Sequence, residues 1–378
     1  MPDEYIERET IGFGKNIGSS IKGFFVGIIF FIAGVIILWI NEGRVNIGKV
    51  AEKLSIPISA EKLDNSYNGK FISATGVFKS TGELGDPGFL KSGPYAVLHR
   101  NVEMYAWVEQ KSTKTRKKIG GKTEKITTYK YKKRWTSKPP ESSSFRHPED
   151  HKNPQLMIPP ATFYALTANI GKYKIDIRSV KLPALRTLSL SKEMLEDGAH
   201  GRVEGSYIFN GVGSIYEPEV GDIRIYYTVL PATFSPATVF GKVEGNSIAP
   251  FFYKGKKKIY RLFIGTREEA IARMKTEHNI IGWLLRILGF LLIWGGFNGL
   301  FGPIFAVLDI LPFLGNITRL LVSFITFIIA LILSIAIILV SMIAHNILAL
   351  IITVVLIVAI FIFVFHRKKE KVIRNSAI

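Results

Sequence analysis

The sequence predicts an α+β membrane protein, with four transmembrane helices and a large β-rich extracytoplasmic domain between spans one and two. Two observations lead to this fold class. Hydrophobic residues make up 48% of the 378-residue chain, but they are concentrated near the N-terminus and after residue 278. Between these regions, residues 42–278 are mixed and polar, and this segment is long enough to bury a core of its own.

The first span is predicted at residues 24–41, after a polar cytoplasmic tail at residues 1–23. Its apolar run, "FFVGIIFFIAGVIILWI", stops at "NEGR" (41–44). As a helix this run is roughly 25 Å long, slightly less than a ~30 Å hydrocarbon core. A cleavable secretion signal ends in small residues, whereas this run ends beside Trp39, a residue type found at headgroup boundaries. The run is therefore interpreted as a retained anchor.

The polar segment between the first two spans has the pattern of a β-rich domain. Stretches rich in β-branched and aromatic residues are separated by Gly, Pro, Asn and Asp turn signals. The segment ends in a helix at 266–278, because Thr266 and Glu269 have the spacing of a capping box. The predicted strands lie at residues 68–80, 101–110, 125–135, 201–210, 222–230 and 238–246.

The last third of the chain predicts three more spans and one broken segment. Residues 303–317 are apolar, but Pro303, Asp309 and Pro312 interrupt them. Irregular backbone at membrane depth must be covered by protein, so a re-entrant or interfacial segment is expected here. The three spans are predicted at residues 279–302, 318–342 and 346–365.

The orientation in the membrane is predicted from the basic tail at residues 366–378. Lys and Arg residues beside a span favour the cytoplasmic side. With four spans, both termini are then cytoplasmic, and residues 42–278 face the outside or an organelle lumen.

Composition and motifs favour a protein without enzymatic activity, cofactor or metal. The chain has no cysteine, which excludes disulfides, zinc–thiolate sites and cysteine nucleophiles. No Gly-x-Ser-x-Gly motif is present. The segment "HPEDHKNP" (147–154) is either a metal site using His147 and His151 or a rigid turn. Because Pro148 opposes a helical pairing of the two histidines and no third ligand is placed, the turn is preferred.

A net charge of +19 points to an acidic partner surface. Residues 111–135 carry eleven Lys or Arg against the single acid Glu124. Nucleic acid, anionic lipid and an acidic protein are all compatible with such a segment, and membrane attachment favours lipid over nucleic acid. The predicted lipid or partner surface consists of Lys117, Lys118, Lys132, Lys133 and Trp135.

Polar residues inside the apolar segments admit two interpretations. Arg286, Asp309 and Arg319 either line an ion path or are structural, with Arg286 reaching the interface and Asp309 pairing with Arg319 or capping a helix. Gly295 and Gly299 form a small-x-x-x-small pattern, which permits close helix packing within one chain or between chains.

Several stretches follow one another in a characteristic order: "NEGR" (41–44), "VEMYAWVE" (102–109), Trp135, "HKNP" (151–154), "LSLSK" (188–192), "PEVGDIR" (218–224), Asp309 and Pro312. This ordered set resembles the transmembrane protein 43 family, also called LUMA. The resemblance implies a self-associating membrane scaffold that organises other proteins; animal members do so with emerin and lamins at the endoplasmic reticulum and inner nuclear membrane. The Lys- and Ile-rich composition is similar to that of a prokaryotic member, which would lie in the inner (plasma) membrane with other envelope proteins as partners. A channel or transporter subunit is the alternative.

Overall fold

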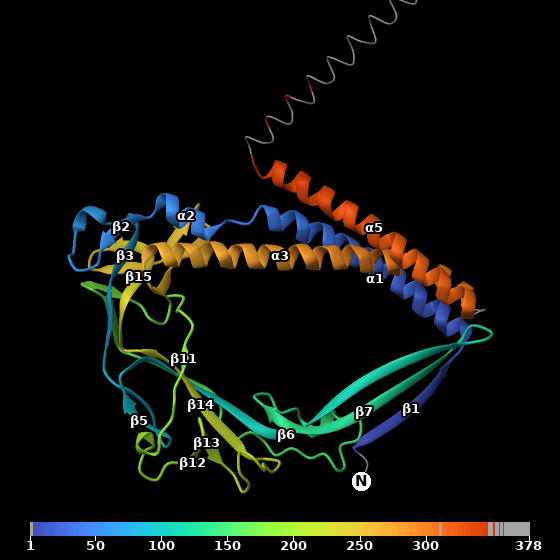
Figure 1. The fold of residues 1–378 in the computed structure, drawn as a ribbon, viewed down its shortest axis with the longest axis horizontal. Coiled ribbons are helices and arrows are strands. Elements are labelled where there is room, and N and C mark those ends of the chain that lie inside the picture. Colours follow the sequence, from blue (N-terminus) through green and yellow to red (C-terminus); the bar gives the residue numbers. More distant parts are fainter. Residues whose placement is uncertain (1–2, 310–311, 347–350, 352–354, 356–357, 359–378) are drawn as a thin grey trace, which may run out of the picture. The chain divides into compact units, whose positions relative to one another are not determined.

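The computed structural model describes residues 3–309, 312–346, 351, 355 and 358 (Figure 1). The described chain forms two compact units. The first unit holds residues 3–7, 46–114 and 126–276, and it contains most of the strands. The second unit holds residues 8–45, 115–125 and the described residues from 277 onward, and it contains the long apolar helices.

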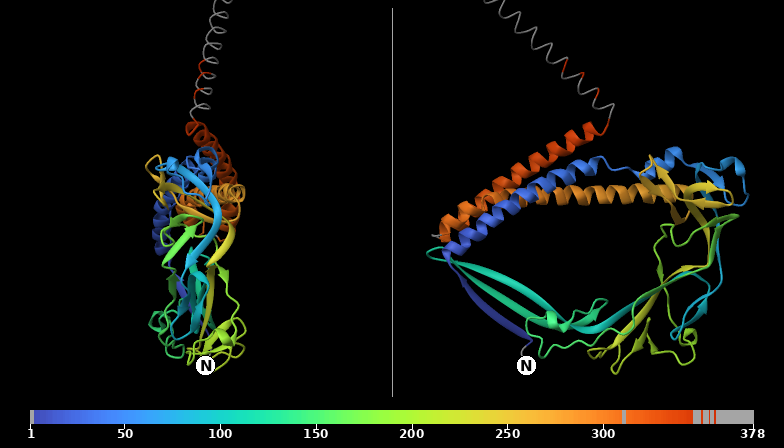
Figure 2. Two further views of the ribbon diagram at one scale, coloured as in Figure 1. Left: turned by 90° about the vertical axis from the view of Figure 1, so that its left-hand side faces the viewer. Right: turned by 180° about the vertical axis from the view of Figure 1, so that it is seen from behind.

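Among the described residues, three helical segments are long and apolar enough to cross a membrane: residues 13–54, which include α1 and α2, residues 267–300 and residues 318–344. In the second unit, the apolar parts of α1, α3 and α5 run alongside one another (Figure 2). The predicted fourth span at 346–365 and the basic tail lie outside the described residues, apart from isolated positions. The α-helices are α1 (Phe13–Glu42), α2 (Ile47–Leu54), α3 (Arg267–Leu300), α4 (Gly302–Leu308) and α5 (Pro312–Ala344).

The N-terminal region differs from the polar tail predicted at residues 1–23. Strand β1 (Glu4–Ile11) forms there, and α1 begins at Phe13 instead of residue 24. The apolar pattern located only the part of α1 that is rich in Ile and Phe. The helix extends further because no proline interrupts residues 13–23.

Helix α3 is longer than either of the two elements predicted for its sequence. The expected helix at 266–278 and the span at 279–302 form one continuous helix. Its start is a capping box: the Thr266 amide donates to Glu269 Oε2 over 3.1 Å, and the Glu269 amide donates to Thr266 Oγ1 over 3.3 Å. Beyond α3, the short helix α4 occupies the first part of the segment predicted at 303–317, with Pro303 in its first turn, and α5 begins within that segment at Pro312.

The larger sheet is built around a long hairpin. Strands β6 (Tyr95–Lys118) and β7 (Lys122–Thr136) pair with each other, and β1 adds to the free side of β7 (Figure 1). The strand order is β1-β7-β6-β14-β13-β12, with β8 also paired to β6 and β11 to β14. The remaining strands are β8 (Ala161–Tyr164), β11 (Arg186–Thr187), β12 (Arg202–Glu204), β13 (Tyr207–Asn210) and β14 (Ile223–Pro231).

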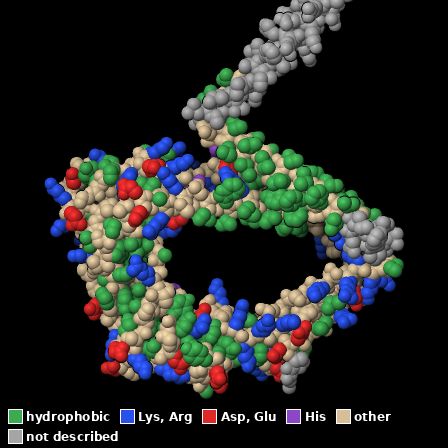
Figure 3. All heavy atoms as spheres, viewed as in Figure 1, with side chains coloured by type: hydrophobic (Ala, Val, Ile, Leu, Met, Phe, Trp, Pro, Cys, Tyr) green, Lys and Arg blue, Asp and Glu red, His purple; other side chains and the backbone are tan. Residues whose placement is uncertain are grey.

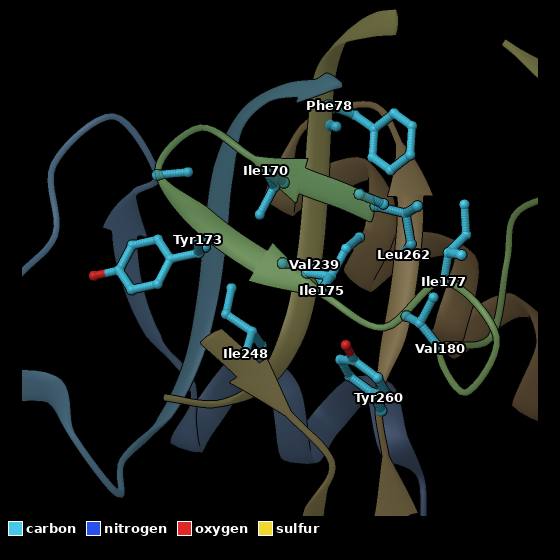
Figure 4. Close-up of a cluster of buried hydrophobic side chains, with 14 of the residues drawn as sticks. Phe78, Ile170, Tyr173, Ile175, Ile177, Val180, Val239, Ile248, Tyr260 and Leu262 are labelled. Carbon is cyan, nitrogen blue, oxygen red and sulfur yellow. The ribbon is translucent and has the colours of Figure 1, made fainter. Parts of the chain in front are cut away.

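The second sheet closes on itself. Its order is β19-β15-β16-β10-β9-β3-β2, and a further pairing of β15 with β3 completes a ring of five strands. The ring surrounds an apolar core that includes Phe78, Tyr173 and Val239 (Figure 4). The strands are β2 (Ile56–Ser59), β3 (Phe71–Thr81), β9 (Thr167–Ile170), β10 (Tyr173–Ile175), β15 (Thr233–Glu244), β16 (Ser247–Ala249) and β19 (Arg261–Ile264).

Short elements complete the first unit. Two separate two-stranded pairs and three 3₁₀ turns connect the main strands. They are β4 (Leu84–Asp86) with β5 (Leu90–Gly93), β17 (Phe251–Tyr253) with β18 (Lys257–Ile259), and η1 (Asn65–Tyr67), η2 (Ser142–Ser144) and η3 (Lys192–Met194).

A buried ionic network fixes the core of the larger sheet. Arg100 Nη1 lies 2.9 Å from each carboxylate oxygen of Asp86, and the Tyr227 hydroxyl donates to Asp86 Oδ2 over 2.6 Å. Asp86 is only 2% exposed. Burial and the hydrogen bond to Asp86 raise the pKa of Tyr227, so its hydroxyl remains a donor. Since a buried carboxylate is costly without its partner, this network depends on all three residues.

We expect Arg100→Met to lower the free energy of unfolding by about 3–5 kcal/mol, because Asp86 is left charged and unpaired. Thermal unfolding of the full chain in detergent measures the effect. The double variant Arg100→Met/Asp86→Asn removes the charge but keeps an acceptor for Tyr227, and it should recover part of the loss. A double variant that is less stable than Arg100→Met would contradict a charge-based cause.

Candidate functional site

Asp309 forms the centre of a buried ion cluster in the second unit. It follows α4, and its side chain is 2% exposed. Arg319 Nη2 lies 3.0 and 2.9 Å from the two carboxylate oxygens, and Lys117 Nζ lies 2.9 Å from Oδ2. The Arg319 guanidinium also lies over the Phe305 ring, 5.3 Å from its centroid. Two cations therefore contact one carboxylate that is shielded from solvent.

Lys117 lies near the end of β6, just before the turn of the β6–β7 hairpin, and this hairpin tip (Thr115–Lys125) is held at a second point. Asn16, in the second turn of α1, donates through Nδ2 to the Gly121 carbonyl over 2.8 Å and to Thr123 Oγ1 over 2.9 Å. Gly120 and Gly121 have φ values of +82° and +70°, which a tight hairpin turn requires. Sequence reasoning missed Asn16, because its partners lie more than a hundred residues further along the chain.

Glu42 and Arg286 form a second ion pair between α1 and α3. Arg286 Nε and Nη2 each lie 2.8 Å from a different oxygen of Glu42, and the Glu42 side chain is 7% exposed. Arg44 Nη1 donates to Asn41 Oδ1 over 3.0 Å, and Asn41 Nδ2 donates to the Gly282 carbonyl over 3.2 Å. The "NEGR" stretch thus fixes the end of α1 against α3 through the side chains of Asn41, Glu42 and Arg44.

Glycines allow α1 and α3 to approach each other closely. A Cβ atom on Gly299 would lie 2.8 Å from the Gly27 Cα, and one on Gly34 would lie 2.7 Å from the Gly289 carbonyl oxygen. Gly295, by contrast, has only the Phe30 ring as a neighbour, at 3.9 Å. Of the two glycines singled out in the sequence, Gly299 therefore lies in a tight contact within one chain, and Gly295 lies outside it.

The five residues predicted as a lipid or partner surface have different surroundings. Lys118 lies 3.3 Å from Glu124 in the hairpin tip, while the Lys133 ammonium lies over the Trp107 ring in the first unit. Trp135 is covered by the Arg224 guanidinium, 4.6 Å from a ring centroid. Lys132 is exposed. Most of these side chains therefore make specific contacts inside their own unit.

The two histidines of "HPEDHKNP" pack against tyrosines. His147 stacks on Tyr5 with ring centroids 4.0 Å apart, and His151 stacks on Tyr131 at 3.8 Å. The Tyr131 hydroxyl donates to Glu109 over 2.6 Å; burial and this hydrogen bond raise its pKa to about 12. Among the described residues, no group of three His, Asp or Glu side chains is placed to hold a metal.

Asn153 of the same stretch connects it to the strand of the "VEMYAWVE" motif. Its Oδ1 accepts from the Trp107 amide over 2.8 Å, and its Nδ2 donates to the Trp107 carbonyl over 3.0 Å. Asp222 of "PEVGDIR" likewise accepts from the amides of Val212, Gly213 and Glu219. These motif residues order loops through backbone hydrogen bonds.

Long apolar helices with internally paired charges, carried on the same chain as a large β-rich unit, define an α+β membrane protein. The comparison with protein families identifies the family. Residues 104–347 match the family model described as transmembrane protein 43, and the chain belongs to this family.

Animal relatives match over most of the chain. Transmembrane protein 43 of Rattus norvegicus is 27% identical over 319 residues, and that of Homo sapiens is 27% identical over 321 residues; both alignments cover 80% of this chain and 79% of the relative. The transmembrane protein 43 homolog of Drosophila melanogaster is 24% identical over 280 residues, or 71% of this chain and 74% of the relative. No solved structure matches the chain.

We expect Gly299→Ala and Gly34→Ala each to destabilise the protein by about 1–3 kcal/mol, because the added methyl group overlaps backbone atoms of the facing helix. Gly295→Ala is the matched control; it has room for the methyl group and should not destabilise the protein. Thermal unfolding in detergent compares the three variants. Equal losses at positions 295 and 299 would show that close packing is not the cause.

We also expect Lys117→Gln to release the hairpin tip. Loss of a charge-assisted hydrogen bond is worth about 1.5–3 kcal/mol, so local opening, and with it tryptic cleavage at Lys118 and Lys122, should rise about tenfold or more. Lys132→Gln is the control, because that side chain is exposed. Cleavage of the tip at the same rate in both variants would argue against the contact with Asp309.

Proposed function

We propose that the protein is a non-enzymatic membrane scaffold that self-associates and organises other membrane or envelope proteins. The observation that carries this proposal is the pairing of charges within the apolar helices. Arg286 is bound through two nitrogens to Glu42, and both oxygens of Asp309 are occupied by Arg319 and Lys117. Charges held in such pairs fix helices and a hairpin to one another.

The alternative is a channel or transporter subunit. In such proteins, polar residues inside the membrane line a water-filled path and exchange partners with the transported ion. Charges that are already bound to partners on neighbouring elements of the same chain fit this role less well. We therefore prefer the scaffold function over the channel function. Ion conduction by the purified protein would reverse this preference.

The proposed partners are of two kinds. Lipid, including anionic lipid, would contact the helices, where large apolar side chains are exposed (Figure 3). Proteins would dock on the first unit, where Val212 and Tyr216 in one loop are 85% and 88% exposed. The compartment would be the inner (plasma) membrane in a prokaryote, or the endoplasmic reticulum and inner nuclear membrane in a eukaryote.

Two measurements test the scaffold. Purified protein in liposomes should leave ion flux, followed with a potential-sensitive dye, equal to that of empty liposomes; added gramicidin shows that the dye responds. In cells, crosslinking before gentle extraction should retain specific proteins. Val212→Asp/Tyr216→Asp should reduce their recovery several-fold, whereas Leu63→Asp, at a different exposed apolar position, should not.

Ion flux above the level of empty liposomes would favour the channel alternative. Recovery of the same proteins with both variants would remove the Val212–Tyr216 loop as the docking surface. Loss of the protein from the membrane fraction in either variant would show a folding defect, and the recovery is therefore normalised to membrane-inserted protein.

A further inference from the structure

The two-stranded hairpin of β17 and β18 (Phe251–Ile259) is seated on the first unit by one of its faces. The Phe251 ring stacks on the Phe71 ring of β3 with centroids 4.2 Å apart, and Ile259 is fully buried. Tyr253 packs against the same apolar cluster, and all of these residues belong to the first unit. Because side chains alternate along a strand, this packing also fixes which side chains of the hairpin point away from the unit.

The exposed surface of the hairpin combines an aromatic ring with lysines. Phe252 is 54% exposed and lies opposite Lys258 in the register of the two strands. Lys254, Lys256 and Lys257 are also exposed, at the turn and directly after it. The sequence "FFYKGKKKI" therefore places four lysines and no acid within residues 251–259.

Among the described residues, no carboxylate forms an ion pair with these four lysines. Lys258 Nζ donates to the Ser179 carbonyl over 3.3 Å, and the Lys254 ammonium lies over a tyrosine ring. By contrast, Lys275 Nζ, elsewhere in the same unit, lies 2.7 Å from a carboxylate oxygen of Glu52. The positive charge of the hairpin is therefore available to an anionic surface outside the described chain.

The apolar cluster under the hairpin also contains segments that are joined in sequence to the apolar helices. Ala51 belongs to α2, which begins at Ile47, shortly after α1 ends at Glu42. Ala270 belongs to the first turns of α3, and this helix continues without a break to Leu300. Chain connectivity alone therefore keeps a bilayer surface within reach of the hairpin.

A bilayer surface uses both features of the hairpin. An aromatic ring surrounded by cations is suited to the boundary between headgroups and acyl chains, where the ring enters the apolar side and the ammonium groups reach the phosphates. Lysine is a compact charge on a flexible stem, so it binds a phosphate without a fixed orientation. An acidic protein would use the charges, but a bilayer is present wherever the apolar helices are inserted.

We infer that the β17–β18 hairpin is an interfacial anchor for anionic phospholipid, in which Phe252 enters the headgroup boundary and the four lysines bind phosphate groups. Each lysine near an anionic surface contributes about fivefold to the binding equilibrium. The anchor adds a second attachment of the first unit to the membrane beside its covalent connections. It would serve a scaffold and a channel subunit alike, so it does not depend on the proposed function.

This surface is distinct from the lipid surface predicted within residues 111–135. That segment stands out in the sequence by its eleven cations, but Lys118 pairs with Glu124 and the Lys133 ammonium lies over a tryptophan ring. The hairpin has fewer cations and no ion pair within the described chain. Its distinguishing feature is the exposure of Phe252, which depends on the packing of the neighbouring side chains.

A fluorescent label at Phe252→Cys tests insertion, because the chain has no native cysteine. The full chain, labelled with nitrobenzoxadiazole, is placed in nanodiscs of phosphatidylcholine alone or with added phosphatidylglycerol. We expect phosphatidylglycerol to shift the emission to shorter wavelength and raise it several-fold, and high salt to reverse this change by screening the lysines. Val212→Cys, at an 85% exposed position, is the control and should not respond. The same emission at position 252 in neutral and anionic nanodiscs would overturn the inference.

The variant Lys256→Gln/Lys257→Gln tests the lysines. It should raise the share of phosphatidylglycerol needed for half of the emission change several-fold, because two of the four phosphate contacts are lost. Lys138→Gln/Lys152→Gln is the matched control, since it removes the same charge at exposed positions of the same unit. Equal weakening by both variants would show that net charge, and not the hairpin, governs binding; that result would contradict the inference.

Tryptic cleavage of the unlabelled chain gives a readout without any substitution in the hairpin. Nanodiscs leave both faces of the bilayer accessible to the protease. Phosphatidylglycerol should slow cleavage after Lys254 and Lys256 several-fold, while cleavage after the exposed Lys138 should keep its rate. If the hairpin is cleaved equally fast in neutral and anionic nanodiscs, it stays in water, and an acidic protein becomes the better candidate for its partner.

Discussion

A carboxylate removed from water must be neutralised where it lies, and this constraint organises the second unit. Asp309 meets it by bringing together α5, through Arg319, and the hairpin tip, through Lys117. Glu42 meets it by joining the end of α1 to α3 through Arg286. The apolar surfaces of the helices are interchangeable in register, since hydrophobic contact has no direction. The ion pairs fix how far each helix is shifted along its neighbour. In this register the glycines of α1 face those of α3, so the two helices can approach closely.

The first unit also pairs a buried carboxylate, and it has in addition a separate apolar core. Its larger sheet buries Asp86 with Arg100 and Tyr227, while its ring of five strands encloses an apolar core. The ring has no free edge among its five members, so its stability rests on packing. The larger sheet is open at β1, and its periphery is held by loop contacts such as Asn153 with Trp107. Several family motifs lie in loops or at the end of a helix, such as "HKNP", "PEVGDIR" and "NEGR".

Local patterns in the sequence predicted local structure well. Alternating apolar residues located β6 and β14, and the Thr266–Glu269 spacing located the start of α3. The pairing of Asp309 with Arg319 was one of two open alternatives, because ten residues separate them in the sequence. Sequence reasoning missed β1 and the contacts of Asn16 and Lys117. Those partners lie more than a hundred residues away in the chain, where neither periodicity nor spacing carries information.

The pairing of β1 with β7 also has a consequence for biosynthesis. Strand β1 and helix α1 leave the ribosome first, but β7 begins only at Lys122. At about 5–20 residues per second, the missing partner strand is completed roughly 6–25 s later. During that interval an apolar helix must be kept from aggregating, while the segment before it has nothing to pair with. The order of translation thus makes early shielding of α1, by lipid or by a chaperone, a requirement for assembling the larger sheet.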